Sequence, residues 1–311
     1  MKAAAAIAIF LSLAIFTSVN AQVKTAPKAA PVRSIKVVTE PSAAVWIDSV
    51  MYGRTSNDGS LTIKPGAGAH TLRVRADGFK EKSQPLTAVQ KGEVKVALVK
   101  TTDEAELAFQ DAERLVATDR EKAVAAYQKA VKLRPAFPEA YVAMARTQAD
   151  LGDLDDALRS IAAARKLRPG YAEASAVEGR VQKEFGEEDK AIAAFKRAVT
   201  EGKGTQPEAL TGLGLLYKDR AETAASSGNT DEETINYNEA IKNLKAATKQ
   251  LSGAPDAMVV MQILGLIYER QQKIPEAIAV YEEFLRLFPD KSESEAVRSF
   301  VTQLRKQLAG Q

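Results

Sequence analysis

Apolar and small residues recur at helical spacing, three and four positions apart, from Glu104 to Pro289. The pattern also repeats along the chain at an interval of 34 residues. One copy contains Ala157, Ile161, Ala164 and Pro169, and the copies before and after it contain Ala123, Tyr127, Ala130 and Pro135, and Ala191, Phe195 and Ala198. Later copies contain Gly214, Tyr217, Ala240 and Leu244, and then Gly265, Tyr268, Ala277, Tyr281 and Pro289. Each copy predicts two amphipathic helices, because each carries two apolar stripes.

A 34-residue period with a small residue on each helix, an aromatic or aliphatic residue four positions after the small residue of the second helix and a proline at the end resembles the tetratricopeptide repeat (TPR) family. The resemblance covers about two thirds of the chain and implies an all-α superhelix of about five repeats over residues 101–290. Such solenoids present a surface to a partner, so it also implies that a protein or peptide binds in the groove lined by the first helices.

The fourth repeat is longer than the others, with 14 more residues between Gly214 and Ala240 than between Gly265 and Ala277. Because the apolar stripes continue on both sides of Ser226, we expect an extended helical hairpin near residues 217–240. A loop insertion is the alternative. Residues 291–311 predict a C-terminal capping helix whose apolar face contains Val297, Phe300, Val301, Leu304 and Leu308.

Helix starts are predicted where a hydroxyl or carboxyl side chain is followed three residues later by an acid. The predicted N-caps are Thr101, Thr118, Asp153, Thr230 and Ser292.

Residues 34–99 show a different period, in which apolar and polar residues alternate. The alternating pairs are Ile35 and Val37, Val45 and Ile47, Leu61 and Ile63, Leu72 and Val74, and Val94 and Val96. Turn signals separate them, at Glu40-Pro41, Tyr52-Gly53, Asn57-Asp58-Gly59, Pro65-Gly66 and Asp77-Gly78. Several short strands within residues 34–99 predict a small antiparallel β-sandwich.

The same block resembles the PEGA domain, a small β-module of bacterial and archaeal envelope proteins. The resemblance rests on Pro41-Ser42-Ala43-Ala44, Val45-Trp46-Ile47-Asp48, Gly53-Arg54-Thr55, Gly68-Ala69-His70-Thr71-Leu72 and Ala76-Asp77-Gly78-Phe79. Within the first motif, Ser42 and Ala43 stand where the family has Glu and Gly.

The first residues indicate export. Lys2, an apolar run to Phe16 and the small residues Val19 and Ala21 predict a signal peptide over residues 1–21, cleaved after Ala21. A permanent membrane anchor is the alternative, although the run is shorter than the roughly 20 residues that a bilayer needs. Residues 22–33, rich in Ala, Lys and Pro, predict a linker. We therefore expect a periplasmic or cell-envelope protein with no transmembrane span after cleavage.

The charge is divided unevenly, with a net +6 over residues 22–99 and −4 over residues 100–311. In the basic block, Arg73, Arg75 and Lys95 are candidates for a patch that binds an anionic cell-wall polymer, and Trp46 is a candidate for stacking on a sugar ring. The alternatives are an ordinary solvated surface and a tryptophan packed at the rim of the core.

In the groove of the helical array, Arg146, Arg180, Lys183 and Lys218 are expected to form a ladder of positive charge that suits an acidic peptide. Acidic residues alternate with these four, so ion pairs between neighbouring helices are the alternative interpretation.

No catalytic, cofactor-binding or metal-binding cluster is visible. There is no cysteine, and His70, the only histidine, is expected to have a structural role in the β-domain. Secretion and an acidic array argue against nucleic acid. The sequence thus predicts a non-enzymatic adaptor or scaffold of the cell envelope. The alternative is an envelope-polymer binding protein that acts through its basic β-domain, with the helical array as a spacer.

Overall fold

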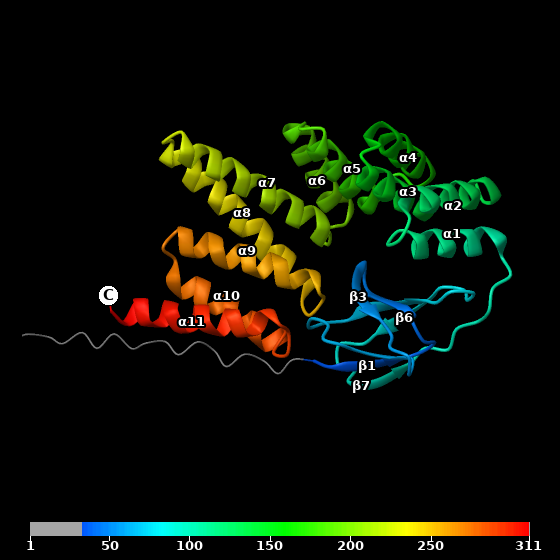
Figure 1. Ribbon diagram of the computed structural model, residues 1–311, viewed down its shortest axis with the longest axis horizontal. Coiled ribbons are helices and arrows are strands. Elements are labelled where there is room, and N and C mark those ends of the chain that lie inside the picture. The colour runs from blue at the N-terminus through cyan, green and yellow to red at the C-terminus, as the bar shows by residue number, and fades with distance from the viewer. Residues whose placement is uncertain (1–32, 311) are drawn as a thin grey trace, which may run out of the picture. The chain divides into compact units, whose positions relative to one another are not determined.

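The computed structural model describes residues 33–310. The predicted signal peptide and all of the predicted linker except Arg33 lie outside these residues. The described chain consists of a β-domain followed by eleven α-helices (Figure 1). None of these helices combines the length and the apolar character needed to cross a membrane.

The β-domain contains two sheets that enclose an apolar core. One has the strand order β4-β1-β7 and the other β3-β2-β5-β6. Ile35, Val37, Val45, Leu72 and Val74 face the core and are completely buried, as their alternation with polar residues predicts. The seven strands are β1 (Ile35–Val38), β2 (Ala44–Ile47), β3 (Val50–Arg54), β4 (Ser60–Ile63), β5 (His70–Arg75), β6 (Lys82–Leu86) and β7 (Gly92–Lys95).

The sandwich differs from the prediction in three respects. Strands β1 and β7 pair in parallel, so the domain is not purely antiparallel. Tyr52-Gly53, predicted as a turn, lies within strand β3, where Gly53 has φ of 139° and the register with β2 shifts at Val45 and Trp46. Strand β6 was missed because it contains Pro85 and several polar residues; it is an edge strand, which tolerates a proline.

The eleven helices form five antiparallel pairs and one final helix. They are α1 (Glu104–Leu115), α2 (Arg120–Leu133), α3 (Pro138–Leu151), α4 (Leu154–Leu167), α5 (Ala172–Glu184), α6 (Glu188–Glu201), α7 (Pro207–Ser226), α8 (Thr230–Leu251), α9 (Asp256–Arg270), α10 (Ile274–Leu287) and α11 (Glu293–Ala309). Small residues allow the helices of a pair to approach closely. A Cβ added to Gly265 would lie 2.4 Å from the Tyr281 ring, and one added to Gly179 would lie 2.5 Å from the Phe195 ring.

The fourth pair is the extended one. Helices α7 and α8 have 20 and 22 residues, whereas the helices of the other four pairs have 12 to 15. The extra residues therefore continue two helices and do not form a loop, and Figure 1 shows the resulting hairpin. In α11, Val297, Val301 and Leu304 are buried against the array, while Phe300 and Leu308 are nearly half exposed.

Several helix caps also differ from the prediction. The carboxylates of Asp103 and Asp119 and the amide of Asn229 cap helices α1, α2 and α8, instead of the neighbouring threonines. Asp153 and Ser292 stand at the predicted N-cap positions but make no capping hydrogen bond. A polar residue directly before the first helical turn reaches the free N–H groups best, whereas Thr101 and Thr118 lie further upstream and Thr230 lies inside the first turn.

The β-domain contacts both ends of the helical array. At α1, the backbone N–H of Gly78 donates to Gln110 Oε1 over 2.8 Å, and Gln110 Nε2 donates to the Phe79 carbonyl over 2.8 Å. At the other end, Tyr52 Oη donates to the Leu251 carbonyl over 3.2 Å, and Lys64 Nζ donates to the Leu287 carbonyl over 2.6 Å. The apolar core of the sandwich is continuous with that of helices α7 to α11. The β-domain therefore bridges the first repeat and the last two repeats.

Candidate functional site

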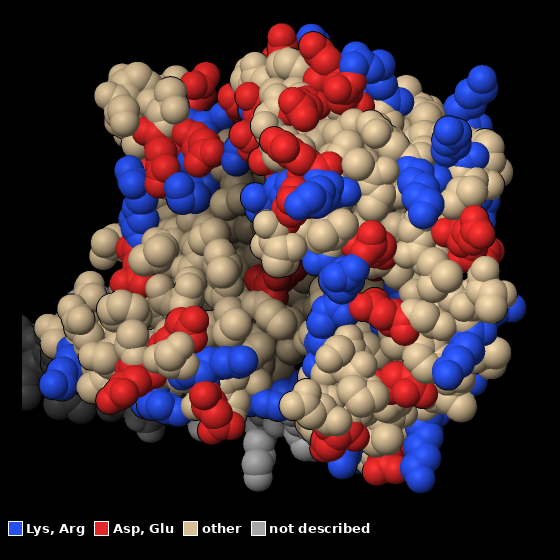
Figure 2. Space-filling view, turned by 45° about the vertical axis from the view of Figure 1, so that its right-hand side comes forward, with Lys and Arg blue, Asp and Glu red and all other residues tan. Residues whose placement is uncertain are grey.

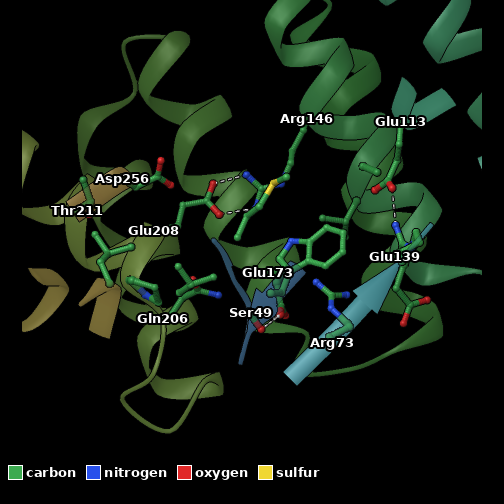
Figure 3. Close-up of a pocket in the computed structure, with 18 of the residues that line it drawn as sticks. Ser49, Arg73, Glu113, Glu139, Arg146, Glu173, Gln206, Glu208, Thr211 and Asp256 are labelled. Atoms are coloured by element: carbon green, nitrogen blue, oxygen red, sulfur yellow. Dashed lines mark hydrogen bonds and ion pairs between the residues drawn. The ribbon is translucent and has the colours of Figure 1, made fainter. Parts of the chain in front are cut away.

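A pocket of about 720 Å³ lies between the β-domain and the inner helices of the array. The β2–β3 hairpin and strand β5 line one side, and helices α1, α3, α5, α7 and α9 line the other (Figure 3). The space-filling view shows this part of the molecule hollowed, with acidic and basic residues mixed around the opening (Figure 2). The volume falls within the range of about 300–1,000 Å³ that is usual for ligand sites.

Three glutamates line the pocket at equivalent positions of successive repeats. Glu139, Glu173 and Glu208, which we term the glutamate ladder, are each the second residue of a first helix, in α3, α5 and α7. A carboxylate is favourable there because the first turn of a helix presents free N–H groups and a partial positive charge.

Two members of the glutamate ladder are neutralised by arginine. Glu139 pairs with Arg168, which follows the second helix of the same repeat. Glu208 accepts two hydrogen bonds from Arg146, one of them 2.5 Å long, and this pair joins α7 to α3 (Figure 3). Burial alone would lower the pKa of Arg146, but the contact with Glu208 outweighs it and raises the pKa above its usual value.

The third member is different. Glu173 makes no ion pair with any residue between 33 and 310, and its only hydrogen bond in that range comes from Ser49 Oγ of the β2–β3 hairpin, over 3.0 Å (Figure 3). At this point of the pocket, a neutral hydroxyl of the β-domain meets a carboxylate of the array.

The opposite wall is formed by arginines stacked on Trp46. The guanidinium carbons of Arg73 and Arg75 lie 4.5 and 5.5 Å from the centre of the Trp46 ring. Arg75 is only 8% exposed and donates to Glu113 of α1 over 2.6 Å and to Glu81 over 2.5 Å. Burial alone would lower the pKa of Arg75, but these two carboxylates outweigh it and raise the pKa.

The predicted cationic ladder does not converge on one site. Arg146 alone lines the pocket. Arg180 pairs with Asp150, and Lys218 pairs with Glu222 over 2.7 Å and with Asp219 over 3.6 Å. Lys183 is half-buried and makes no ion pair within the described part of the chain. Arg180 thus makes the ion pair between helices of neighbouring repeats that the alternative interpretation describes, whereas Arg146 pairs across two repeats and Lys218 pairs within its own helix.

The four residues proposed to bind envelope polymers do not form one patch. Trp46, Arg73 and Arg75 line the pocket and face the helices, so strand alternation alone did not predict their surroundings. Lys95 lies on the other sheet, its side chain is 80% exposed, and its Nζ is 3.6 Å from Glu93.

His70 begins strand β5, and its ring nitrogens lie 2.9 Å from Asp48 Oδ2 and 3.1 Å from the Gly66 carbonyl. It therefore holds two loops of the β-domain together. Within residues 33–310, no cluster of histidine, aspartate and glutamate has the composition of a metal site.

The sequence prediction missed the pairing state of the glutamate ladder and the role of Ser49. The glutamates were visible as a recurrence at intervals of 34 and 35 residues. Ser49 carried no signal, because only the docking of the β-domain brings it to Glu173, 124 residues away.

Three segments of the helical array match models of the tetratricopeptide repeat, at residues 118–137, 142–207 and 234–292. Comparison with curated protein sequences gives no match.

Among solved structures, yeast Tom70 is similar over 67% of this chain and 41% of its own, with 18% identity and a TM-score of 0.53. A thermophilic TPR protein from Thermus thermophilus is similar over 64% of this chain and 98% of its own, with 21% identity and a TM-score of 0.45. The MamA protein of Desulfovibrio magneticus RS-1, from its residue 41 onward, is similar over 61% and 98%, with 20% identity and a TM-score of 0.43.

The likeness to Tom70 shows the fold of the array, and the family models identify its repeats. The 34-residue pattern of the sequence, the paired helices and these matches agree, and the helical part of this chain is a tetratricopeptide repeat solenoid.

Proposed function

We propose that this protein is a non-enzymatic adaptor of the cell envelope that binds a short extended segment of a partner protein in the pocket between its β-domain and its TPR array. The proposal rests on the observation that the β-domain and the TPR array both line the pocket. Five inner helices line one side, where a solenoid of this kind receives its partners, and the β2–β3 hairpin and strand β5 line the other.

The β-domain restricts what can enter. It is bonded to α1 at one end of the array and to Leu251 and Leu287 at the other, so the width of the groove is fixed from both sides. A pocket of about 720 Å³ in a groove of fixed width suits a few residues of extended chain and excludes a folded domain. A preformed site also avoids part of the ordering cost of binding.

The setting in the envelope follows from the predicted signal peptide and from the resemblance of the β-domain to PEGA modules. The mature chain then begins at Gln22. Amino-terminal sequencing of protein isolated from its natural cells tests this, and an intact Met1 would replace the exported adaptor with an anchored or intracellular one.

The alternative, binding of an anionic envelope polymer through the β-domain, has less support. Three of its four candidate residues line a pocket with five acidic and three basic side chains. An excess of acid repels a polyanion.

Site-specific photocrosslinking tests the adaptor function. A photoreactive residue replaces Thr211, which lines the pocket on α7, and in the control it replaces Thr223, which is exposed on the same helix outside the pocket. We expect the Thr211 position to form an adduct with one defined protein, through an unstructured segment or a chain terminus, and the Thr223 position to form none. The absence of any protein adduct at Thr211, or equal adducts at both positions, would refute the proposed site.

A further inference from the structure

We propose that Glu173 is the recognition point for a lysine or arginine side chain of the bound peptide. This inference rests on the proposed function and defines its specificity. The pocket would select a segment with a positive side chain and would reject an acidic one.

Comparison of the repeats shows that Glu173 lacks a partner that its counterparts have. Arg134 follows helix α2 and lies 3.8 Å from Glu106 of its repeat, and Arg168 follows α4 and pairs with Glu139 of its own. The next position, 34 residues on, is Gly202. The third repeat therefore keeps the glutamate but has no arginine of its own that pairs with it. Arg146 and Arg168, whose ion pairs are with Glu208 and Glu139, act on Glu173 only at longer range.

Open space lies beside this position. A second pocket of about 390 Å³ lies beside Gly202 and shares Ser49, Glu173 and Tyr171 with the first. A Cβ at Gly202 would lie 2.6 Å from the Thr205 carbonyl, so the local backbone does not accept a side chain at this position. Arg73 and Arg168 also line this second pocket, but among the described residues they pair with Glu81 and Glu139, so a direct ion pair at Glu173 requires a cation from a bound partner.

Ser49 is a weak substitute for that cation. Its hydroxyl gives Glu173 one neutral hydrogen bond of 3.0 Å, whereas a guanidinium or ammonium gives charge-assisted bonds that are roughly twice as strong. A basic side chain can displace the hydroxyl with a net gain, and because Glu173 and Ser49 line both pockets, it would then lie where the two pockets meet.

The arginines on the opposite wall of the pocket, Arg73 and Arg75, have N–H donors that need hydrogen-bond acceptors. The Nε–H groups of Arg73 and Arg75 are buried and have no hydrogen-bond partner among the described residues, and both side chains line the pocket. A buried donor without a partner costs about 1–3 kcal/mol. These two nitrogens are out of reach of a ligand, but the Arg73 side chain is 29% exposed, and its terminal N–H groups can donate to backbone carbonyls of an extended chain. Acceptors for Arg73 together with a cation for Glu173 describe a basic peptide rather than a free amine or a polyanion.

Trp46 provides a direct assay, because it is the only tryptophan of the chain and it lines the pocket. The probes are two blocked pentapeptides with alanine at every position except the centre. One carries arginine there, and the other carries citrulline, which has the same shape without the charge. Trp46 fluorescence and calorimetry of the full-length protein measure their binding.

We expect the arginine peptide to bind at least tenfold more tightly than the citrulline peptide, a difference of about 1.4 kcal/mol. Glu173→Gln should remove this difference, and the matched control Glu184→Gln, an exposed residue of the same helix, should preserve it. Ser49→Ala should tighten binding of the arginine peptide about twofold or more, because no hydroxyl then competes for Glu173.

The outcomes separate this inference from the proposed function. Equal binding of the two peptides to the wild type, or a preference that persists in Glu173→Gln, would overturn the role of Glu173 and leave the pocket as a peptide site. Binding of neither peptide by either method would overturn the inference, and the crosslinking experiment would then decide about the pocket alone. Circular dichroism of each variant verifies that it is folded.

Discussion

Arg75 holds the β-domain to the first helix, so removal of its partner should loosen that contact in a measurable way. Arg75 is 8% exposed, and its guanidinium donates to Glu113 of α1 and to Glu81 of its own domain and lies 4.6 Å from the centre of the Phe109 ring. The change with the clearest expectation is Glu113→Ala, which removes the only one of these carboxylates that belongs to the array.

The expected loss of unfolding free energy depends on which partners of Arg75 remain after the substitution. Complete loss of the partners of a buried charge costs about 3–5 kcal/mol. Glu81 stays in place, so we expect Glu113→Ala to cost the equivalent of one charge-assisted hydrogen bond, about 1.5–3 kcal/mol of unfolding free energy. Arg75→Met in the same background should cost less than it does alone, with a coupling energy of about 1–2 kcal/mol.

Urea unfolding followed by Trp46 fluorescence measures this, because the Trp46 ring lies 5.5 Å from the Arg75 guanidinium. Far-ultraviolet circular dichroism follows the helices in parallel. The control is Glu93→Ala, whose partner Lys95 is 80% exposed, and it should change stability by less than about 1 kcal/mol. A coupling energy below about 0.5 kcal/mol between positions 75 and 113 would refute the view that this pair secures the β-domain to α1.

Three further predictions concern the array, the pocket and the dependence on pH. Ala157 is completely buried, so Ala157→Leu should lower the unfolding free energy by roughly 1–3 kcal/mol through overpacking. The control Ala162→Leu, on the exposed side of the same helix, should not lower it. Similar melting temperatures for the two variants would contradict the packing assigned to Ala157. Arg146→Glu should lower the melting temperature more than Arg180→Glu. Among the described residues, Arg146 makes two hydrogen bonds to the Glu208 carboxylate across the groove, while Arg180 makes one to Asp150. The reverse order of melting temperatures would argue against the Arg146 pair as a structural link. Hydrogen bonds from Ser56 and Ser60 hold the pKa of Asp58 below its usual value, so its contribution to stability is present above about pH 4 and is lost as the pH falls through the lowered pKa. Asp58→Asn should therefore lose less stability than the wild type on acidification below about pH 4, as melting temperatures at a series of pH values would show, and parallel curves would contradict this role.

The secondary structure was largely predictable because its signals are local. The small residue and the aromatic residue of each repeat, such as Gly265 and Tyr281, meet within one helical pair, so a 34-residue recurrence was enough to predict the array. The alternation around Val45 and Leu72 predicted core strands for the same reason. Strand β6 escaped prediction because an edge strand with Pro85 and polar residues has no apolar period.

The site depended on contacts between distant parts of the chain. Strand alternation placed Arg73 and Arg75 opposite the core residues Leu72 and Val74, but it carried no information about what that face meets. Only the docking of the β-domain turned it toward the helices and made it one wall of a pocket.

The charges in the groove also show which features the sequence predicts and which depend on the tertiary structure. The sequence by itself determined that acids and bases alternate along the first helices at the repeat interval. The tertiary structure decided how they pair: Arg146 pairs with Glu208 two repeats away, while Glu173 receives, from residues 33–310, only the hydroxyl of Ser49. Ion pairing depends on distances of a few ångströms between helices and domains, and a repeat period sets the order of residues along the chain but not those distances.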